Sequence, residues 1–439
     1  MSQDNLSIKN TLTNVVSLQT HESKISPLVE SQSKFLASSL SLSTADLEFP
    51  PSSSPAPDLV CLSHLRWNFV YQRPQHLLTR CAKKRRVFVI EEPIFDSAQD
   101  EKLDIIQHES GVWVVVPHLP ENLSESAINS IQQRLIDQLF AELQIHNYIL
   151  WYYTPMAMAF TRHLEPLVTV YDCMDELSLF AGAPPSLKAC EAELFKRTEL
   201  VFTGGQSLYE VKRNQHPNVH AFPSSIDTAH FAQARNFKAD PLDQADIPHP
   251  RLGFFGVIDE RMDLELLALL AEAKPNWHLV IIGPVVKIDP AILPRHKNIH
   301  YLGGKNYQEL PDYIAGWDVA LLPFARNEST RFISPTKTPE YLAAGKPVVS
   351  TSIRDVVNPY GQMDMVYIAD TVAQFITAIE TALNQNSDPS RLAKVDTFLA
   401  QTSWDSTWEG MIQLVESVIY PRKDRTAKIQ NSEVKKLAK

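Results

Sequence analysis

Short apolar runs rich in β-branched residues alternate along this chain with segments of helical length. The runs are continuously apolar instead of alternating with polar residues, which is typical of parallel strands buried on both faces of a sheet. Helices are predicted between them, for example at 125–144, 186–198, 261–273 and 370–384. This succession of strands and helices predicts an α/β fold built from doubly wound parallel sheets.

The predicted strands fall into two series, separated by a polar stretch with several prolines at 233–250. The first series lies at 59–62, 87–90, 112–116, 148–152, 168–171, 200–202 and 219–222, and the second at 252–257, 278–282, 299–301, 319–322, 348–350 and 366–368. We therefore expect two Rossmann-like domains, 58–235 and 236–402, followed by a helix at 403–420. Ligands of such sheets bind beyond the carboxyl ends of the strands, so the loops there should carry the chemistry.

The two ends of the chain differ from this body. Residues 1–57 contain 14 serines and no glycine and end in a proline-rich run, which predicts a disordered leader with a stiff linker. Residues 421–439 carry seven Lys and Arg residues against two acidic ones. This tail is expected to be flexible, and either solvated or in contact with anionic lipid or an acidic partner.

Composition excludes several classes of protein. The net charge of −10 argues against general nucleic-acid binding, and no apolar run reaches the length of a membrane span. The start lacks the pattern of a secretory signal, and the four cysteines include no closely spaced pair. We expect a cytoplasmic protein with reduced thiols, with peripheral contact at the inner membrane face as a further option for its basic tail.

The segment 331–349 has the strongest functional pattern. Ser334 and Pro335 are typical of a helix start, and Gly345 is typical of a helix end that leads into the next strand. The free N–H groups at such a start bind phosphate. Lys337 and Glu340 share one face, where the lysine would meet an anion and the carboxylate would accept hydrogen bonds from a sugar diol. The alternative is a surface ion pair on an ordinary helix.

Residues 339–349 resemble the donor-domain signature of GT-B glycosyltransferases, especially the large retaining family 4, in which a Glu precedes a small-residue helix that ends in Gly-x-Pro-Val-Val. The resemblance implies that Glu340 binds the nucleotide ribose. It also implies that the residues just before Glu340 bind the diphosphate and donor sugar, namely Ser334, Thr336 and Lys337. The family often has another Glu eight residues earlier; this chain has Phe332 there, so the sugar-side carboxylate is either absent or displaced to Glu328.

The loop after the first predicted strand, 63–76, is similar to that of a bacterial GT-B subgroup with a Trp…Gln-Arg-Pro-x-His pattern. No glycine precedes Gly111, so side chains, instead of the backbone of a glycine-rich turn, are expected to bind the ligand here. The candidate acceptor and phosphate ligands are Arg66, Arg73, His64 and Trp67, with His64 also a candidate catalytic residue. A structural anchor for Arg73 and a core position for Trp67 are the alternatives.

Carboxylates follow the strand at 168–171. Asp172 is a candidate acceptor ligand, and Asp175 could align an acceptor hydroxyl or act as general base. The alternative is a helix cap or a salt bridge. A DxD motif and an adjacent histidine are both missing, so no metal site is expected.

The loop after the first strand of the second series resembles the family's Gly-x-x-x-x-x-Lys loop, which implies that Gly256 and Arg261 contact the donor diphosphate. An exposed charge at a helix start is the alternative for Arg261. Gly283 and Lys287 follow the next strand and are expected to line the nucleotide pocket. A third glycine at dinucleotide spacing is lacking, which disfavours NAD binding.

Taken with this resemblance, the sequence predicts a GT-B glycosyltransferase whose last helix, 403–420, crosses back to the first domain. It would move a sugar from a UDP- or GDP-linked donor to a glycan, lipid-linked or small-molecule acceptor, without a cofactor or metal and with retention of configuration. Asp175, His64, Lys337 and Arg261 would be catalytic. Two alternatives stay open: a GT-B-fold sugar-nucleotide epimerase and a non-catalytic protein that binds nucleotide sugars.

Overall fold

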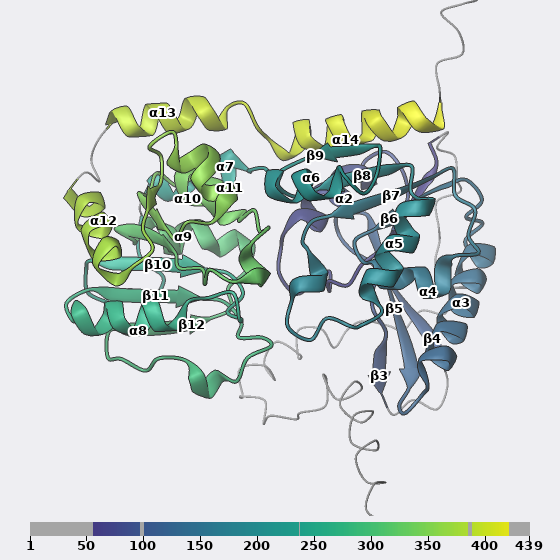
Figure 1. Ribbon diagram of the computed structural model, residues 1–439, viewed down its shortest axis with the longest axis horizontal. Coiled ribbons are helices and arrows are strands. Elements are labelled where there is room, and N and C mark those ends of the chain that lie inside the picture. The colour runs from purple at the N-terminus through teal and green to yellow at the C-terminus, as the bar shows by residue number, and fades with distance from the viewer. Residues whose placement is uncertain (1–55, 97–100, 237, 385–388, 421–439) are drawn as a thin grey trace, which may run out of the picture.

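The computed structural model describes residues 56–96, 101–236, 238–384 and 389–420, and these form two α/β domains (Figure 1). The predicted tail and all but the end of the predicted leader lie outside the described residues.

The N-terminal domain is built on a sheet with the strand order β3-β5-β2-β1-β6-β7-β8-β9. Its strands are β1 (Asp58–Leu62), β2 (Val87–Ile90), β3 (Ile94–Asp96), β4 (Lys102–Gln107), β5 (Val112–Pro120), β6 (Tyr148–Tyr152), β7 (Val168–Cys173), β8 (Leu200–Thr203) and β9 (Val219–Ala221). All pair in parallel except β4, which is antiparallel to β5. The parallel strands confirm the sequence prediction. The strands β3 and β4, which pair with β5 at the edge of the sheet, were not predicted.

Helices cover both faces of this sheet. They are α2 (Arg73–Ala82), α3 (Glu125–Glu142), α4 (Met158–Thr161), α5 (Leu187–Arg197) and α6 (Gln206–Lys212). Successive residues of β1 point to opposite faces: Val60 packs in one apolar cluster with α3 and α5, and Leu59 in another with α2 and the last helix. Burial on both faces explains why the strand sequences are continuously apolar.

The C-terminal domain has a fully parallel sheet with the order β12-β11-β10-β13-β14-β15. Its strands are β10 (Arg251–Phe255), β11 (His278–Ile282), β12 (Ile299–Gly303), β13 (Val319–Leu322), β14 (Val348–Ser350) and β15 (Tyr367–Ile368). Its helices are α7 (Thr228–Phe231), α8 (Leu264–Ala273), α9 (Leu310–Ala315), α10 (Lys337–Ala343), α11 (Arg354–Val356), α12 (Val372–Asn384) and α13 (Pro389–Leu399). The strand order reverses between β10 and β13, where ligands of doubly wound sheets bind.

The last helix, α14 (Trp404–Ile419), lies along the N-terminal domain, whereas α13 lies on the C-terminal domain (Figure 1). Trp404, Trp408 and Met411 are on one face of α14 and are buried in the cluster with α2. The Trp404 ring stacks on His76 with the ring centroids 4.4 Å apart. The chain therefore crosses between the domains twice.

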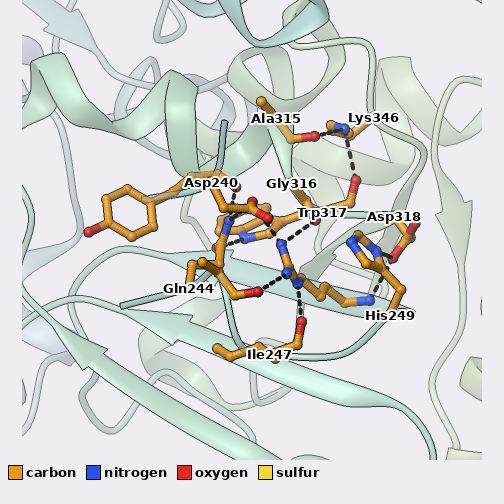
Figure 2. A network of polar contacts seen from close by, with 12 residues as sticks. Asp240, Gln244, Ile247, His249, Ala315, Gly316, Trp317, Asp318 and Lys346 are labelled. Atoms are coloured by element: carbon orange, nitrogen blue, oxygen red, sulfur yellow. Dashed lines mark hydrogen bonds and ion pairs between the residues drawn. The ribbon is translucent and has the colours of Figure 1, made fainter. Parts of the chain in front are cut away.

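The stretch between the two strand series is packed on the C-terminal domain (Figure 2). The buried Arg251 guanidinium pairs with Asp240 at 2.7 Å and donates to the Ile247 carbonyl at 2.7 Å. Trp317 Nε1 donates to the Gln244 side chain at 2.9 Å. Since Arg251 begins β10, this network fixes the end of the sheet that is opposite the carboxyl edge.

None of the helices in the described part of the chain combines the length and the apolar character that crossing a bilayer requires.

Candidate functional site

Glycine backbone lines the carboxyl edge of the C-terminal sheet. Gly256 and Gly283 follow β10 and β11, and both have positive φ angles, +139° and +144°. A Cβ atom on Gly283 would overlap the Gly256 carbonyl oxygen, and one on Gly256 would overlap the Lys337 side chain. Only glycine can bring these strand ends together and leave room for Lys337.

Helix α10 begins at Lys337, so the prediction of Ser334 as its N-cap is wrong. Thr336 precedes the helix with helical backbone angles and no capping hydrogen bond from its side chain. Pro339 therefore lies in the first turn, where its missing N–H is no loss. Gly345 ends the helix as predicted, with φ +79° and its N–H donating to the Leu342 carbonyl at 2.9 Å.

Glu340 lies buried one turn into α10, with 7% of its surface exposed. Its Oε2 atom has no hydrogen-bond partner among the described residues, and neither do Tyr307 Oη and Thr338 Oγ1. Burial raises the pKa of Glu340 to about 7, although Lys337 opposes the shift; burial also lowers the pKa of Lys337. An unpaired buried carboxylate is unfavourable unless a partner satisfies it, which makes Glu340 a candidate ligand-binding residue.

Basic side chains of the C-terminal domain face the N-terminal domain beside α10. Arg261 pairs with Asp259 at 2.6 Å, and its guanidinium lies over the Phe180 ring at 5.3 Å. The Lys287 ammonium lies over the same ring at 5.5 Å. Phe180 belongs to the loop after β7, so cations of one domain contact the other domain here.

Asp175 lies on this same loop and faces the cations. Burial raises its pKa to about 6, with Asp259 adding to the rise, while Arg261, Lys287 and Lys337 all lower it. A carboxyl group that interacts with three cations of the other domain lies at the point where the two carboxyl edges meet. The structure thus brings together four residues that the sequence placed on separate loops.

His64 follows β1 at the same edge. Burial and the nearby Lys287 lower the pKa of His64 to about 4. A hydrogen bond with the Tyr153 backbone acts in the opposite direction and is outweighed. Its Nδ1 atom has no partner among the residues described. The imidazole is therefore neutral near pH 7 and has a nitrogen available to a ligand.

Arg73 and Asp172 were predicted to bind the acceptor, and the structure contradicts this. The Arg73 guanidinium donates to both Asp172 oxygens at 2.9–3.1 Å, and the two side chains are only 1% and 0% exposed. Arg73 also donates to the Phe222 carbonyl at 2.8 Å. The pair anchors α2 to β7 inside the domain, where no acceptor can reach it.

Trp67 is likewise a core residue instead of a stacking platform. Its ring is buried against α2 and its backbone N–H donates to Glu91 Oε1 at 2.6 Å. Arg66 is partly exposed but pairs with the same Glu91 at 3.0 Å. Gln75 donates to the Trp67 carbonyl at 2.7 Å. Trp67 and Arg73 therefore hold the first loop in shape, whereas His64 and Arg66 are only partly buried.

The displaced sugar-side carboxylate is not found at either candidate position. Phe332 packs against the apolar cluster of the N-terminal domain. The Glu328 side chain is 71% exposed and lies 3.4 Å from Arg331. Ser334 packs closely against Gly205 of the N-terminal domain. A Cβ atom added to Gly205 would lie only 2.8 Å from the Cβ atom of Ser334. The segment before α10 is thus an interdomain contact.

Three residues of this region were missed by sequence reasoning: Tyr307, Phe180 and Asp355. Tyr307 stacks on His230, with centroids 4.3 Å apart, and burial and Glu340 both raise its pKa. Phe180 lies in the loop after β7, Tyr307 begins a 3-10 turn and Asp355 lies in the short helix α11, and none of these segments has a motif of its own. Their proximity to the site comes only from the packing of the domains.

A family model described as glycosyl transferases group 1 matches residues 249–385. The match covers the glycine-lined edge, Arg261, Lys337 and Glu340. Residues 249–385 are thus similar to a group 1 glycosyltransferase domain. A curated relative, the putative teichuronic acid biosynthesis glycosyltransferase TuaH of Bacillus subtilis, is 30% identical over 141 residues, which are 31% of this chain. The matched part spans only about a third of that relative, 36% of its length.

Solved structures with low sequence identity share the two-domain fold of this chain. Sucrose-phosphate synthase from Thermosynechococcus elongatus has a TM-score of 0.64 at 12% identity, covering 83% of this chain and 100% of that one. The E. coli trehalose-6-phosphate structure bound with UDP-2-fluoro glucose has a TM-score of 0.60 at 13% identity, with 81% and 98% covered. Anabaena HepE in complex with UDP and glucose scores 0.56 at 13% identity, with 82% and 99% covered. The GT-B fold predicted from the sequence is confirmed.

Proposed function

We propose that this protein transfers a sugar from a UDP- or GDP-linked donor to a hydroxyl group of a glycan, lipid-linked or small-molecule acceptor. The observation that carries the proposal is the buried Glu340 carboxylate, whose Oε2 is without a partner in the described chain, next to Lys337 at the carboxyl edge of the C-terminal sheet. Similarity to TuaH, and to structures that hold UDP or UDP-2-fluoro glucose, supports the same class of donor.

Glu340 would accept hydrogen bonds from the two ribose hydroxyls of the donor. A diol supplies two O–H donors, which match the free capacity of one carboxylate. The glycine backbone at Gly256 and Gly283 would let the diphosphate approach the strand ends closely, with Lys287 at the side of the pocket. Ser334 and Thr336, just before α10, are the remaining candidate donor ligands.

Lys337 and Arg261 would stabilise the departing diphosphate. Cleavage of the anomeric C–O bond leaves negative charge on the phosphate oxygens, and fixed cations in a dry site stabilise that charge strongly. Lys337 lies at the first turn of α10, whose free N–H groups add to this field. No metal ion is required in this scheme, because two cations and a helix start supply the positive charge.

Asp175 and His64 would act on the acceptor side. A carboxyl with a pKa of about 6 is mostly ionised at pH 7 and can orient or deprotonate an acceptor hydroxyl. The neutral His64 would accept or donate one further hydrogen bond to the acceptor. We propose retention of the anomeric configuration, the outcome that the family resemblance implies.

The test is product analysis with UDP- and GDP-sugars, a panel of acceptors and the purified protein. NMR of a new glycoside, absent with Lys337→Met, would support transfer and would also give the anomeric configuration. Conversion of the nucleotide sugar with no acceptor present would instead identify an epimerase.

A non-catalytic nucleotide-sugar-binding protein is the second candidate, because Phe332 occupies the position of the family's other Glu and packs on the N-terminal domain. Nucleotide binding with no turnover across the acceptor panel would favour it.

A further inference from the structure

A cavity of ≈ 570 Å³ lies between the two domains. Most of its lining belongs to the N-terminal domain: the loop after β7, helix α5 and helix α6. The segment just before α10, with Arg331 and Phe332, lines the opposite side. Its volume is in the range of small-molecule sites, and neither the donor ligands nor His64 line it.

The cavity has a polar base that is built into the fold. The Lys212 side chain is 1% exposed, and its ammonium lies 2.8 Å from Glu176 and 2.7 Å from Glu191. Tyr171 also donates to Glu191, at 2.8 Å. This network fixes two carboxylates at the cavity wall, where their remaining lone pairs can accept hydrogen bonds from sugar hydroxyls.

Aromatic and basic side chains complete the lining. Phe195 and Phe332 add apolar surface from the two domains, with the Lys212 ammonium over the Phe195 ring at 5.6 Å and the Arg331 guanidinium over the Phe332 ring at 5.1 Å. Lys188 and Lys196 on α5 are exposed at the cavity, and neither has an ion pair or hydrogen bond to any other residue in the described ranges. Across the cavity Arg331 pairs with Glu328 at 3.4 Å, so the two lysines without a partner are the groups that favour an anionic ligand.

One short loop connects this cavity to the proposed reaction centre. Asp175 interacts with the cations of the donor domain, and Phe180 lies beneath Arg261 and Lys287. Between them, Glu176 and Leu179 line the cavity. A ligand in the cavity would therefore contact Glu176, the residue after Asp175, and lie mainly on the N-terminal domain, the side opposite the donor.

We propose that this cavity is the acceptor subsite and that it takes an anionic saccharide, one whose sugar carries a carboxylate or a phosphate. The carboxylates at the base would hold hydroxyl groups, the two phenylalanines would supply apolar contact, and Lys188 and Lys196 would bind the acidic group. This inference rests on the proposed function, since it assigns the acceptor of the same reaction.

Three sugars that differ at C6 test it: glucuronate, glucose 6-phosphate and glucose, titrated at low salt into protein saturated with UDP. We expect one or both anions to bind at least about tenfold more tightly than glucose. Comparison of glucuronate with glucose 6-phosphate shows whether the site prefers a carboxylate or a phosphate. In the variant with both Lys188→Ala and Lys196→Ala, this preference should fall to less than about threefold. Lys297→Ala, which removes an exposed lysine of the C-terminal domain, is the matched control and should retain it.

Equal binding of all three sugars, or a preference that survives in the double variant, would overturn the acceptor assignment. UDP affinity is measured first in the same titrations. Absence of the sugar preference in the wild type with UDP binding intact contradicts only the acceptor subsite, whereas failure of both UDP and GDP to bind the wild type contradicts the proposed function itself.

Discussion

The Asp355 carboxylate of the C-terminal domain accepts a hydrogen bond from the backbone N–H of Ser207, 3.0 Å away at the start of helix α6 in the N-terminal domain. Next to it, Arg354 pairs with Glu210 across the same interface. A carboxylate at a helix start stabilises the free N–H groups and the positive end of the helix dipole. The two domains are therefore joined by a helix cap supplied from the other domain.

Replacement of Asp355 by Ala should loosen this contact. The loss of a cap corresponds to about 0.5–2 kcal/mol, which favours an open arrangement of the domains. Small-angle scattering should show a larger radius of gyration than for the wild type, while UDP affinity changes less than about twofold. Glu210→Gln, which weakens an exposed ion pair at the same interface, is the control. An unchanged radius for Asp355→Ala would show that the cap does not hold the domains together.

Replacement of Arg73 by Met should destabilise the N-terminal domain strongly. It leaves the Asp172 charge buried without its partner, and breaking such pairs costs about 3–5 kcal/mol. Urea unfolding measures the loss. Arg80→Ala breaks a pair with the exposed Asp405 and should cost less than about 1 kcal/mol. Equal effects of the two substitutions would contradict the structural role of Arg73.

Stability should depend on pH through Glu340. Its pKa is about 7 in the folded protein, against 4.5 ordinarily, so the folded state binds the proton more tightly than the unfolded state. The resulting penalty grows as pH rises from about 4.5 to about 7 and is constant above that range. Glu340→Gln removes it, so this variant should have a higher Tm than the wild type at pH 8 and the same Tm at pH 4. A Tm difference that does not vary with pH would contradict the burial of an unpaired carboxylate.

Replacement of Gly256 by Ala should impair the site through Lys337. Both Gly256 and Gly303 have positive φ angles, so Ala is strained at either position. An added Cβ at Gly256 overlaps the Lys337 side chain, whereas nothing lies within 4 Å of one at Gly303. Gly256→Ala should therefore lower UDP affinity at least about tenfold, and Gly303→Ala less than about threefold. Titration calorimetry compares them, and similar affinities would argue against contact of Lys337 with the diphosphate.

Much of the fold could be predicted from periodicity, because strands buried on both faces leave continuous apolar runs. The edge strands β3 and β4 could not, since Ile94, Phe95 and Ile106 are largely exposed and are interspersed with polar residues. Their pairing with β5 depends on the sheet already being formed.

The site could be predicted only in part. Lys337 and Glu340 lie on the predicted helix and the glycines at the strand ends, although α10 begins at Lys337 and not after Ser334. Arg73 looks like an anion ligand in sequence, but its carboxylate partner is 99 residues away in the chain. Such a pairing, like the approach of Asp175 to Arg261, depends on tertiary packing, which no local pattern encodes.

In the proposed function, Glu340 is the ribose ligand of a nucleotide-sugar site. Calorimetric titration of UDP and GDP into the wild type, Glu340→Gln and Glu340→Ala tests this role, with Glu328→Gln as the control for an exposed carboxylate before α10. We expect at least one nucleotide to bind the wild type and the control equally, and both Glu340 variants to bind it at least about tenfold more weakly while remaining folded. Unchanged nucleotide affinity in folded Glu340→Gln and Glu340→Ala would contradict this role.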